Sequence, residues 1–400
     1  MKALQLFFIA VIFLGACTNP NEVVKDEQFT LRVSQDTVLF DTLFTTIKSI
    51  TKRFRVYNDE ENAREIQSIR VAGGSTSAYE LIINGIRGTE FTRQVLLGGD
   101  SLQILVEATI DIQNNNNPLI VRDSIIFESS SPQDNVLLLA WGQDANYLKD
   151  SVISCNTTWE AGKPYVLLGS ILVDSLCSLT IDAGAKVYSG FNSSFFVRGS
   201  LQVNGTNDES VIFRNDRTDE GFNEAPGQWE GIYFLEGSTN NQINHARIIN
   251  SKYGIWLGTP DADTLPDLTI SNSIIANVSR TGLIAFTSDL QVVNTLIHTC
   301  GEFAVANLAG GNYSYNHCTF TNYPIVFFRE DPVAVFSDNI QLADNTTMKG
   351  VTAKIKNVKK NLHPDTVEFN PQLFLFPMAD WHLNGHFENG KQAGGYSKCS

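Results

Sequence analysis

The sequence predicts an all-β protein with two parts, an antiparallel β-sandwich followed by a parallel β-solenoid. Between Ile243 and Phe328, phrases made of strands and turns recur about every 22 residues, a period typical of solenoids. Residues 28–146 instead contain short alternating strands separated by turn-forming clusters, which is typical of a sandwich. With 400 residues, of which 42% are hydrophobic, the chain is long enough for two separate cores.

The N-terminal residues predict an exported, lipid-anchored chain. Lys2 precedes an apolar run, residues 6–14, that is too short to span a bilayer. The next residues, Leu14-Gly15-Ala16-Cys17, resemble the lipobox of bacterial lipoproteins. That resemblance implies cleavage before Cys17 and attachment of the lipid to this cysteine. An ordinary secretory signal followed by a chance cysteine is the alternative.

Residues 1–16 are then the signal peptide and residues 17–27 a polar tether. Within the tether, Lys25-Asp26-Glu27 resembles the acidic surface-export signals of Bacteroidetes lipoproteins, although it lies further from Cys17 than those signals do. The resemblance implies an outer-membrane lipoprotein that is displayed on the cell surface in preference to facing the periplasm. The lipid on Cys17 is the expected contact with the membrane.

Residues 28–146 are predicted to form the sandwich. Turn-forming pairs such as Gly73-Gly74 and Asn84-Gly85 separate its strands. Seven strands are expected, at residues 37–44, 50–57, 66–71, 79–83, 101–109, 119–128 and 136–141. Phrases at residues 55–74, 99–110 and 136–144 resemble the immunoglobulin-like module that precedes β-helices in Bacteroidetes lipoproteins, which implies a spacer or docking role.

Residues 147–342 are predicted to form the solenoid. The phrases LTIDAGAKVYSG and GQWEGIYFLEGSTNNQINHARIINSKYGIWL resemble the right-handed parallel β-helix of the pectin-lyase-like superfold. Asn272, Asn294 and Asn316 recur with the repeat, so we expect them to stack as a ladder of amide hydrogen bonds at one corner. Three glycines are expected at tight corners where a Cβ atom would obstruct the turn: Gly184, Gly199 and Gly205.

Two inserts and a tail depart from the repeat. Residues 215–226 and 259–266 interrupt the coils and are expected to project from one side, where solenoids often carry function. Residues 343–400 are expected to be a C-terminal cap or tail, since a solenoid must protect its last strand edge. The ending differs from the acidic, glycine-rich tail of related lipoproteins, which predicts an atypical or truncated cap.

Five cysteines follow Cys17, and none has the spacing of a zinc site. Cys155 and Cys177 are separated by one period and are expected on neighbouring coils. An exported chain can form disulfides, but buried packing or stacking is the preferred role for all five: Cys155, Cys177, Cys300, Cys318 and Cys399. We expect no metal and no other cofactor.

The net charge of −14 makes nucleic acid an unfavourable partner for the chain as a whole. A glycan or a protein of the cell envelope is the expected partner of the solenoid. Trp229, Tyr233, Tyr253 and Trp256 suggest a strip for sugar stacking, although packing in the core is the preferred interpretation of these four residues.

No catalytic phrase is recognisable, so a non-catalytic binding role is preferred over an enzyme. The alternative is a polysaccharide lyase or glycoside hydrolase of the pectin-lyase-like superfamily. Its candidate residues are Arg280, His298, Glu302 and Arg329, with His298 and Glu302 as the most enzyme-like pair on one coil. Calcium is expected only with the lyase, where Glu330-Asp331 could serve it.

A hydrolase needs two carboxylates that face each other across the bond to be cleaved. In the clear coils, Asp267, Asp289 and Glu302 occupy different points of the repeat. These three carboxylates therefore need not meet.

Overall fold

The computed structural model of the chain describes Val23, Phe29 and residues 31–112, 118–128, 134–219, 221–258, 265–308, 311–321, 340–341, 346–349, 352–354, 358–359 and 367–368. The chain divides into two compact units, Met1–Asp144 and Ala145–Ser400. The described residues form β-strands and one short 3-10 helix, Gly74–Thr76, with no α-helix among them. The predicted all-β class is confirmed.

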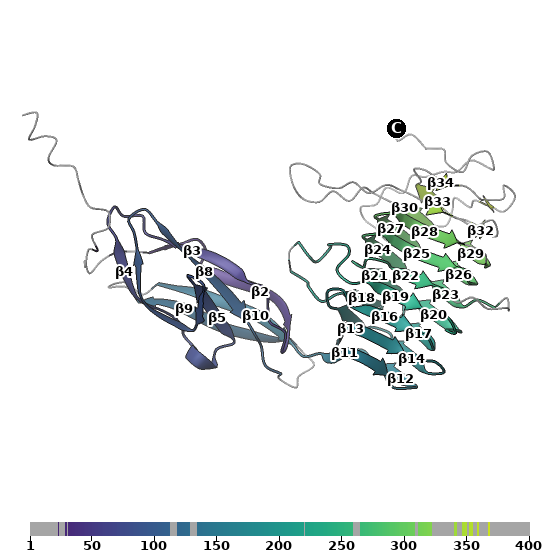
Figure 1. The fold of residues 1–400 in the computed structure, drawn as a ribbon, viewed down its shortest axis with the longest axis horizontal. Helices are drawn as coiled ribbons and strands as arrows, with labels where there is room; N and C mark the ends of the chain where they lie inside the picture. Colours follow the sequence, from purple (N-terminus) through teal and green to yellow (C-terminus); the bar gives the residue numbers. More distant parts are fainter. Residues whose placement is uncertain are drawn as a thin grey trace, which may run out of the picture. The chain divides into compact units, whose positions relative to one another are not determined.

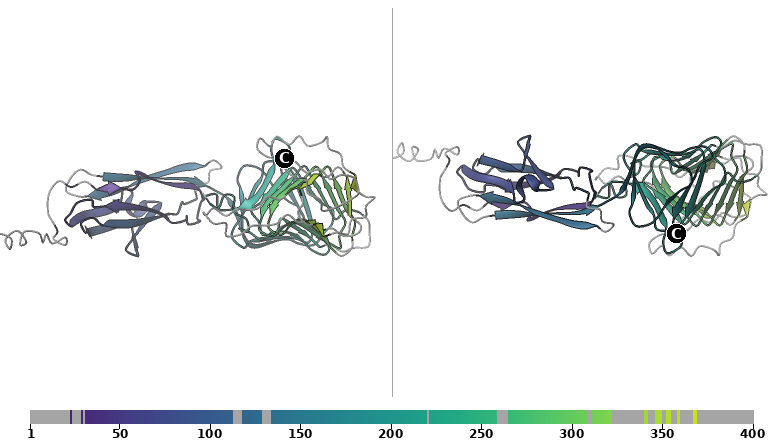
Figure 2. Two further views of the ribbon diagram at one scale, coloured as in Figure 1. Left: turned by 90° about the horizontal axis from the view of Figure 1, so that it is seen from above. Right: turned by 90° about the horizontal axis from the view of Figure 1, so that it is seen from below.

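The first unit is a sandwich of two five-stranded sheets, which Figure 2 shows edge-on as two layers. In sheet order, one sheet contains β1 (Arg32–Val33), β3 (Lys52–Tyr57), β8 (Ser101–Ala108), β5 (Tyr79–Ile83) and β6 (Ile86–Gly88). The other contains β2 (Thr37–Phe44), β10 (Asp134–Gln143), β9 (Leu119–Glu128), β4 (Arg64–Val71) and β7 (Glu90–Leu96).

Alternating apolar residues of both sheets form the sandwich core. Val38 and Phe40 of β2 and Leu138 of β10 are fully buried, and they pack with residues from the other sheet such as Val56 and Ile104. Most strand pairs are antiparallel, as predicted, but β2 and β10 pair in parallel. The alternation therefore located these strands correctly without giving the direction in which they pair.

Three strands of the sandwich, β1, β6 and β7, were not predicted. β1 has two residues, β6 has three, and β7 is largely exposed, so none of them has an alternating pattern of buried residues. β6 pairs with β5 across the Asn84-Gly85 turn, where both residues have positive φ angles of 52° and 80°. This is the turn chemistry that a tight hairpin requires.

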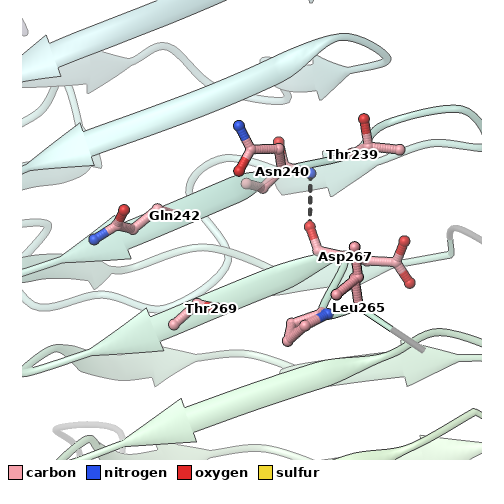
Figure 3. A pocket seen from close by; sticks show the side chains of 8 residues that line it. Thr239, Asn240, Gln242, Leu265, Asp267 and Thr269 are labelled. Carbon is pink, nitrogen blue, oxygen red and sulfur yellow. Dashed lines mark hydrogen bonds between the residues drawn. The ribbon is translucent and has the colours of Figure 1, made fainter. Parts of the chain in front are cut away.

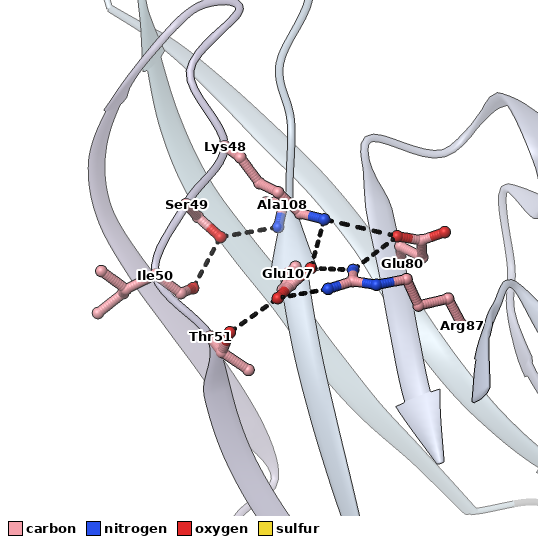
Figure 4. Close-up of polar contacts among 8 residues, drawn as sticks. All are labelled: Lys48, Ser49, Ile50, Thr51, Glu80, Arg87, Glu107 and Ala108. Carbon is pink, nitrogen blue, oxygen red and sulfur yellow. Dashed lines mark hydrogen bonds and ion pairs between the residues drawn. The ribbon is translucent and has the colours of Figure 1, made fainter. Parts of the chain in front are cut away.

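A polar cluster crosses the first sheet of the sandwich (Figure 4). Glu107 of β8 accepts a hydrogen bond of 2.8 Å from the hydroxyl of Thr51 and forms ion pairs with Arg87 and Lys48. Arg87 also contacts Glu80 on β5 at 3.2 Å. Two cations therefore lie against two carboxylates, and Glu107 is the most buried member at 7% exposure.

The second unit is a parallel β-solenoid with three ladders of strands (Figure 1). The first ladder contains β11 (Asn146–Ile153), β13 (Tyr165–Val173), β15 (Lys186–Ser189), β18 (Val211–Asn215), β21 (Ala246–Ile249), β24 (Ile274–Val278), β27 (Leu296–Cys300), β30 (Thr319–Thr321) and β33 (Thr352–Lys354). The second shares β13 and continues with β16 (Ser194–Val197), β19 (Gly231–Phe234), β22 (Ile255–Leu257), β25 (Thr281–Phe286), β28 (Phe303–Leu308), β31 (Ile340–Gln341) and β34 (Val358–Lys359).

The third ladder lies in a separate nine-stranded sheet. It contains β12 (Thr157–Trp159), β14 (Ser178–Asp182), β17 (Ser200–Asn204), β20 (Asn241–Asn244), β23 (Leu268–Ser271), β26 (Leu290–Val293), β29 (Tyr313–Asn316), β32 (Thr346–Lys349) and β35 (Val367–Glu368). The described ladders thus extend beyond residue 342, where the sequence analysis ended the solenoid.

One continuous core fills the solenoid from Ile153 to Met348. At its N-terminal end, the ring of Trp159 stacks on Tyr165 at 4.5 Å and on Phe195 at 5.9 Å. The inward-facing residues of successive coils stack on one another, so that each coil buries the apolar face of its neighbour.

The three predicted corner glycines have two different physical reasons. A Cβ atom on Gly199 would lie 2.1 Å from the carbonyl oxygen of Cys177, and one on Gly205 would lie 2.2 Å from that of His245. Gly184 instead has a φ angle of 78°, a backbone conformation that disfavours other residues.

The cysteines divide into two groups. Cys155 and Cys177 form a disulfide bond between neighbouring coils, so the packing role preferred from the sequence is wrong for this pair. Cys300 and Cys318 are buried free thiols, in agreement with the packing role. Burial raises the pKa of the Cys318 thiol to about 12, which keeps this thiol protonated at neutral pH. Cys399 lies outside the described residues.

The amide ladder is present, but Asn316, one of its three predicted members, does not belong to it. Asn294 Nδ2 donates to Asn272 Oδ1 at 2.7 Å, and Asn272 Nδ2 donates to Asn244 Oδ1 at 2.9 Å. Asn316 pairs in register with Val293, one position before Asn294, and its amide instead donates to Ser314 at 3.3 Å.

The displacement of Asn316 has a simple cause. Leu268 pairs with Leu290, whereas Leu290 pairs with Tyr313, so the later coil contains one more residue. His317 consequently takes the positive φ angle, 53°, that Asn272 and Asn294 adopt in their own coils. Equal sequence spacing is therefore not equal structural position in this solenoid.

The insert at residues 215–226 folds back onto the solenoid instead of merely projecting from it. Asn215 Nδ2 donates to the carbonyl oxygens of Arg217 and Phe222, and Asn250 Nδ2 donates to that of Asn223 at 2.8 Å. Of the second insert, only Leu265 and Pro266 are described, and both are exposed.

Candidate functional site

Aromatic residues form a continuous surface on the outer side of the second ladder. Phe196 of β16, Tyr233 of β19 and Trp256 of β22 pair with one another in register on three successive strands. Their strand neighbours Phe195 and Ile232 point into the core and are fully buried. Tyr253 lies beside these rings, in the turn before β22. We call these four residues the aromatic surface: Phe196, Tyr233, Tyr253 and Trp256.

The rings of the aromatic surface lie in two orientations. Neighbouring rings along the ladder are 5.4 Å apart for Phe196 and Tyr233 and 6.1 Å apart for Tyr233 and Trp256. Tyr253 stands nearly perpendicular to Trp256, at 82° and 5.3 Å. With Trp256 36% exposed, these two rings form an open corner at the protein surface.

Two ion pairs border the aromatic surface at the turns between strands. Lys252 lies 3.2 Å from Glu230, and Arg280 Nε donates to Glu302 at 2.7 Å. Both cations also lie against the ring of Tyr253, at 6.0 Å for Lys252 and 5.4 Å for Arg280. The border therefore offers both cationic donors and anionic acceptors of hydrogen bonds, and their charges cancel.

Electrostatics stabilises one protonation state of Tyr233 and one of Arg280 near neutral pH. Burial, and then the charge of Glu230, raises the pKa of Tyr233 above its ordinary value. The hydrogen bond to Glu302 raises the pKa of Arg280. The tyrosine is therefore neutral and the arginine is charged.

The preferred interpretation of the four predicted aromatic residues is correct for only one of them. Trp229 is in the core at 1% exposure, where its Nε1 donates to the carbonyl oxygen of Ile249 at 2.9 Å. Tyr233, Tyr253 and Trp256 lie at the surface. Phe196 was not predicted as part of this surface, because the repeat is weak there and only the strand register places it beside Tyr233.

Of the candidate catalytic residues, the structure brings together Arg280 and Glu302. They occupy corresponding turns of neighbouring coils, and the side chains are 47% and 41% exposed. His298 lies on β27, where its Nδ1 is 2.8 Å from the hydroxyl of Thr299. Among the described residues, no hydrogen bond or ion pair joins His298 to Glu302. Cys17 and Arg329 lie outside the described residues.

The environment of His298 favours its neutral form. The side chain is 7% exposed, and burial, together with the positive charge of Arg247, lowers the pKa of His298 to about 4. The imidazole therefore carries no charge at neutral pH, and the surrounding protein covers most of it.

Asp267 and Asp289 lie on neighbouring coils at one corner. The backbone N–H of Asp289 donates to Asp267 Oδ2 at 2.8 Å. The carboxylate of Asp289 in turn accepts three hydrogen bonds from the backbone and side chain of Asn312, at 2.7 to 3.0 Å. Both are buried, at 3% and 7% exposure. These carboxylates connect coils, which is a structural use of their acceptor capacity.

Among the described residues, no group of three or more His, Cys, Asp or Glu side chains is placed to hold a metal ion. Glu330-Asp331, the candidate calcium site, lies outside that part of the chain. No helix in the described part is long and apolar enough to cross a membrane.

No protein-family model matches the chain, and no curated protein matches it. Among solved structures, the PapD-like domain 7 of human CEP192 is similar at 7% identity and a TM-score of 0.21, over 33% of this chain and 98% of that domain. A family 123 glycoside hydrolase from Clostridium perfringens is similar at 7% identity and a TM-score of 0.20, over 32% of this chain and 30% of the enzyme.

The catalytic domain of a GH87 α-1,3-glucanase, solved in complex with nigerose, is similar over a longer stretch. The similarity covers 80% of this chain and 91% of the glucanase domain, at 9% identity and a TM-score of 0.17. At such low scores none of these likenesses assigns a function to this chain.

Proposed function

We propose that this chain is a non-catalytic lipoprotein of the bacterial outer membrane that binds glycans through the aromatic surface. The observation that carries the proposal is the open corner of Trp256 and Tyr253 with Lys252 and Arg280 beside it. An aromatic face packs well against the apolar side of a sugar ring. The charged neighbours can hydrogen-bond the sugar hydroxyls, and such charge-assisted bonds are stronger than neutral ones.

The protonation of Arg280 and the burial of His298 favour binding over catalysis. A lyase needs a base that can take a proton, but the hydrogen bond to Glu302 raises the pKa of Arg280 and retains its proton. His298 is neutral but mostly covered. A polysaccharide lyase or glycoside hydrolase is the alternative, and these residues do not favour it.

The other parts of the proposal concern the location of the chain. Cys17 carries the lipid, residues 17–27 are the tether, and the sandwich is an immunoglobulin-like spacer module. Surface display on a Bacteroidetes outer membrane follows from the lipobox and Lys25-Asp26-Glu27. The partner is a glycan or a glycan-bearing protein of the envelope.

The substitution Trp256→Ala tests the glycan-binding proposal. Purified full-length protein in detergent is screened against a glycan array, and the best ligand is measured by isothermal titration calorimetry. Loss of a partly exposed tryptophan that anchors a ligand costs about 2 kcal/mol, or roughly a thirtyfold rise in Kd. Phe191→Ala is the matched control, because Phe191 is 72% exposed on the same solenoid. It leaves Kd unchanged.

Two outcomes contradict the proposal. Equal affinity of the Trp256→Ala variant and the unaltered protein would remove the aromatic surface as the binding site. Release of reducing or unsaturated ends from a polysaccharide, abolished by His298→Ala, would establish the enzyme alternative.

A further inference from the structure

The outer side of the third ladder carries a column of uncharged polar residues. Strand residues alternate there, so that Ile181, Val203, Ile243 and Ile270 point into the core and are fully buried. Their neighbours face outward and pair in register across six successive strands: Thr180, Gln202, Gln242, Thr269, Gln291 and Ser314. Each member bears a hydroxyl or an amide.

The composition and the spacing of this column are both regular. Charged residues make up 18% of the chain, yet none of the six positions carries one. Adjacent strands of a sheet are about 4.8 Å apart, so the polar groups repeat at that distance along the solenoid axis. The side chains of Gln242, Thr269 and Gln291 make no hydrogen bond to other described residues. Their donors and acceptors are therefore available to a ligand.

A groove deepens the column between β20 and β23 (Figure 3). Its volume is about 630 Å³, within the usual range of ligand sites. Gln242 and Thr269 lie on its two strands, while Thr239 and Asn240 lie at one end and Leu265 and Pro266 form an apolar wall.

The charged and buried groups at the groove are already engaged in the fold. Asp267 accepts the backbone N–H of Asp289 through Oδ2. Asn241 Nδ2 donates to the hydroxyl of Ser238 and to the carbonyl oxygen of Asp267, both at 2.9 Å. The groups left for a ligand are thus neutral hydroxyls and amides beside an apolar wall.

We propose that this column and its groove bind one chain of a neutral polysaccharide, which lies along the solenoid axis. Amides and hydroxyls both donate and accept, as sugar hydroxyls do, so each ring can exchange hydrogen bonds with successive coils. The wall of Leu265 and Pro266 packs against the apolar side of a ring. The chain's net charge of −14 disfavours polyanionic polymers, and the column contains no cation to recruit them.

This site is separate from the aromatic surface, which lies on the second ladder. The inference therefore does not depend on the proposed function of that surface. Variants at Gln242 and Trp256 distinguish the two sites, because each substitution alters one ladder only.

Affinity electrophoresis of the full-length protein in detergent tests the inference. The gels contain a soluble β-glucan, an α-glucan or a xylan as neutral polymers, or polygalacturonate as the anionic one. We expect retardation by at least one neutral polymer and none by polygalacturonate. The double variant Gln242→Ala/Thr269→Val removes two hydrogen-bonding groups and raises Kd for that polymer roughly tenfold.

The controls separate loss of binding from loss of folding. Both substituted positions face outward, so the thermal midpoint of the double variant stays close to that of the unaltered protein. Trp256→Ala retains the retardation, which assigns it to the third ladder. Retardation by polygalacturonate alone, or undiminished retardation of the double variant, would overturn the inference. The inference would also fail if no polysaccharide retarded the protein and the regular polar column instead bound ice, which is measured as thermal hysteresis.

Discussion

Glu107 shows how the fold changes the chemistry of a single residue. Its side chain lies at 7% exposure among Arg87, Lys48 and Thr51. The hydrogen bond from Arg87 is the largest cause that lowers the pKa of Glu107 from 4.5 to about 2, and burial opposes it. The carboxylate therefore stays ionised in the folded protein at pH values where the unfolded chain is protonated.

This difference predicts a pH-dependent contribution to stability. Because the folded pKa of Glu107 is the lower one, the contribution is complete above about pH 4.5 and is lost as the pH falls towards 2. Glu107→Gln lowers the free energy of unfolding of the sandwich by about 1–3 kcal/mol at pH 7. Urea unfolding of both proteins, followed by tryptophan fluorescence between pH 7 and pH 3, measures this difference in the free energy of unfolding. A difference between variant and unaltered protein that persists undiminished at pH 3 would contradict the assignment.

At the scale of an element, the coil corner is held by side chains as well as by strand pairing. Asn272 and Asn294 adopt positive φ angles of 50° and 48°, which asparagine tolerates better than most residues. Their amides also link three consecutive coils through Asn244. One residue type thus serves both the turn and the contact between turns.

The displaced register of Asn316 supplies a matched pair of substitutions. Asn294→Ala removes a ladder hydrogen bond and places alanine at a positive φ angle, so it lowers the free energy of unfolding by roughly 2 kcal/mol. Asn316→Ala removes only a 3.3 Å contact with Ser314 and costs less than about 1 kcal/mol. Chemical denaturation of both variants measures the two losses in the free energy of unfolding. Equal losses would mean that the sequence repeat, and not the strand register, gives the correct alignment.

At the scale of the whole molecule, each unit has its own core. Residues from Phe29 to Ala140 form the core of the first unit, and residues from Ile153 to Met348 form that of the second. The disulfide bond of Cys155 and Cys177 lies in the first coils of the solenoid, where one coil face has no preceding solenoid coil to cover it. A disulfide across a loop of this length typically stabilises a protein by about 2–4 kcal/mol.

The proposed anchor predicts how the whole chain partitions in a Gram-negative host that processes lipoproteins. The unaltered chain is expected in the outer-membrane fraction with an intact mass that includes lipid. Cys17→Ala is expected in the aqueous fraction without that mass, because the lipid supplies the membrane affinity. Cys318→Ala is the control and stays membrane-bound. Membrane retention of Cys17→Ala without lipid would contradict the anchor.

Much of the fold was predictable because strand alternation is a local property. The ranges expected for β2, β5 and β9 agree with the observed strands, and the repeat predicted stacked parallel coils. The candidate surfaces were less predictable. Burial in the core was the preferred interpretation of four aromatic residues, and it is correct for Trp229 but wrong for Tyr233 and Trp256. Nothing local indicated that Phe196 would lie beside those two residues.

The sequence by itself determined the all-β class, the alternation of inward and outward residues, and the coil repeat, because each depends on neighbours within a few residues. Only the tertiary structure decided which outward residues share a face. Coils differ in length, so Gln202 pairs with Gln242 across a long insert whereas Thr269 pairs with Gln291 one short coil later. The aromatic surface, the polar column and the Cys155–Cys177 bond all depend on that register, which hydrogen bonding and core packing between coils determine.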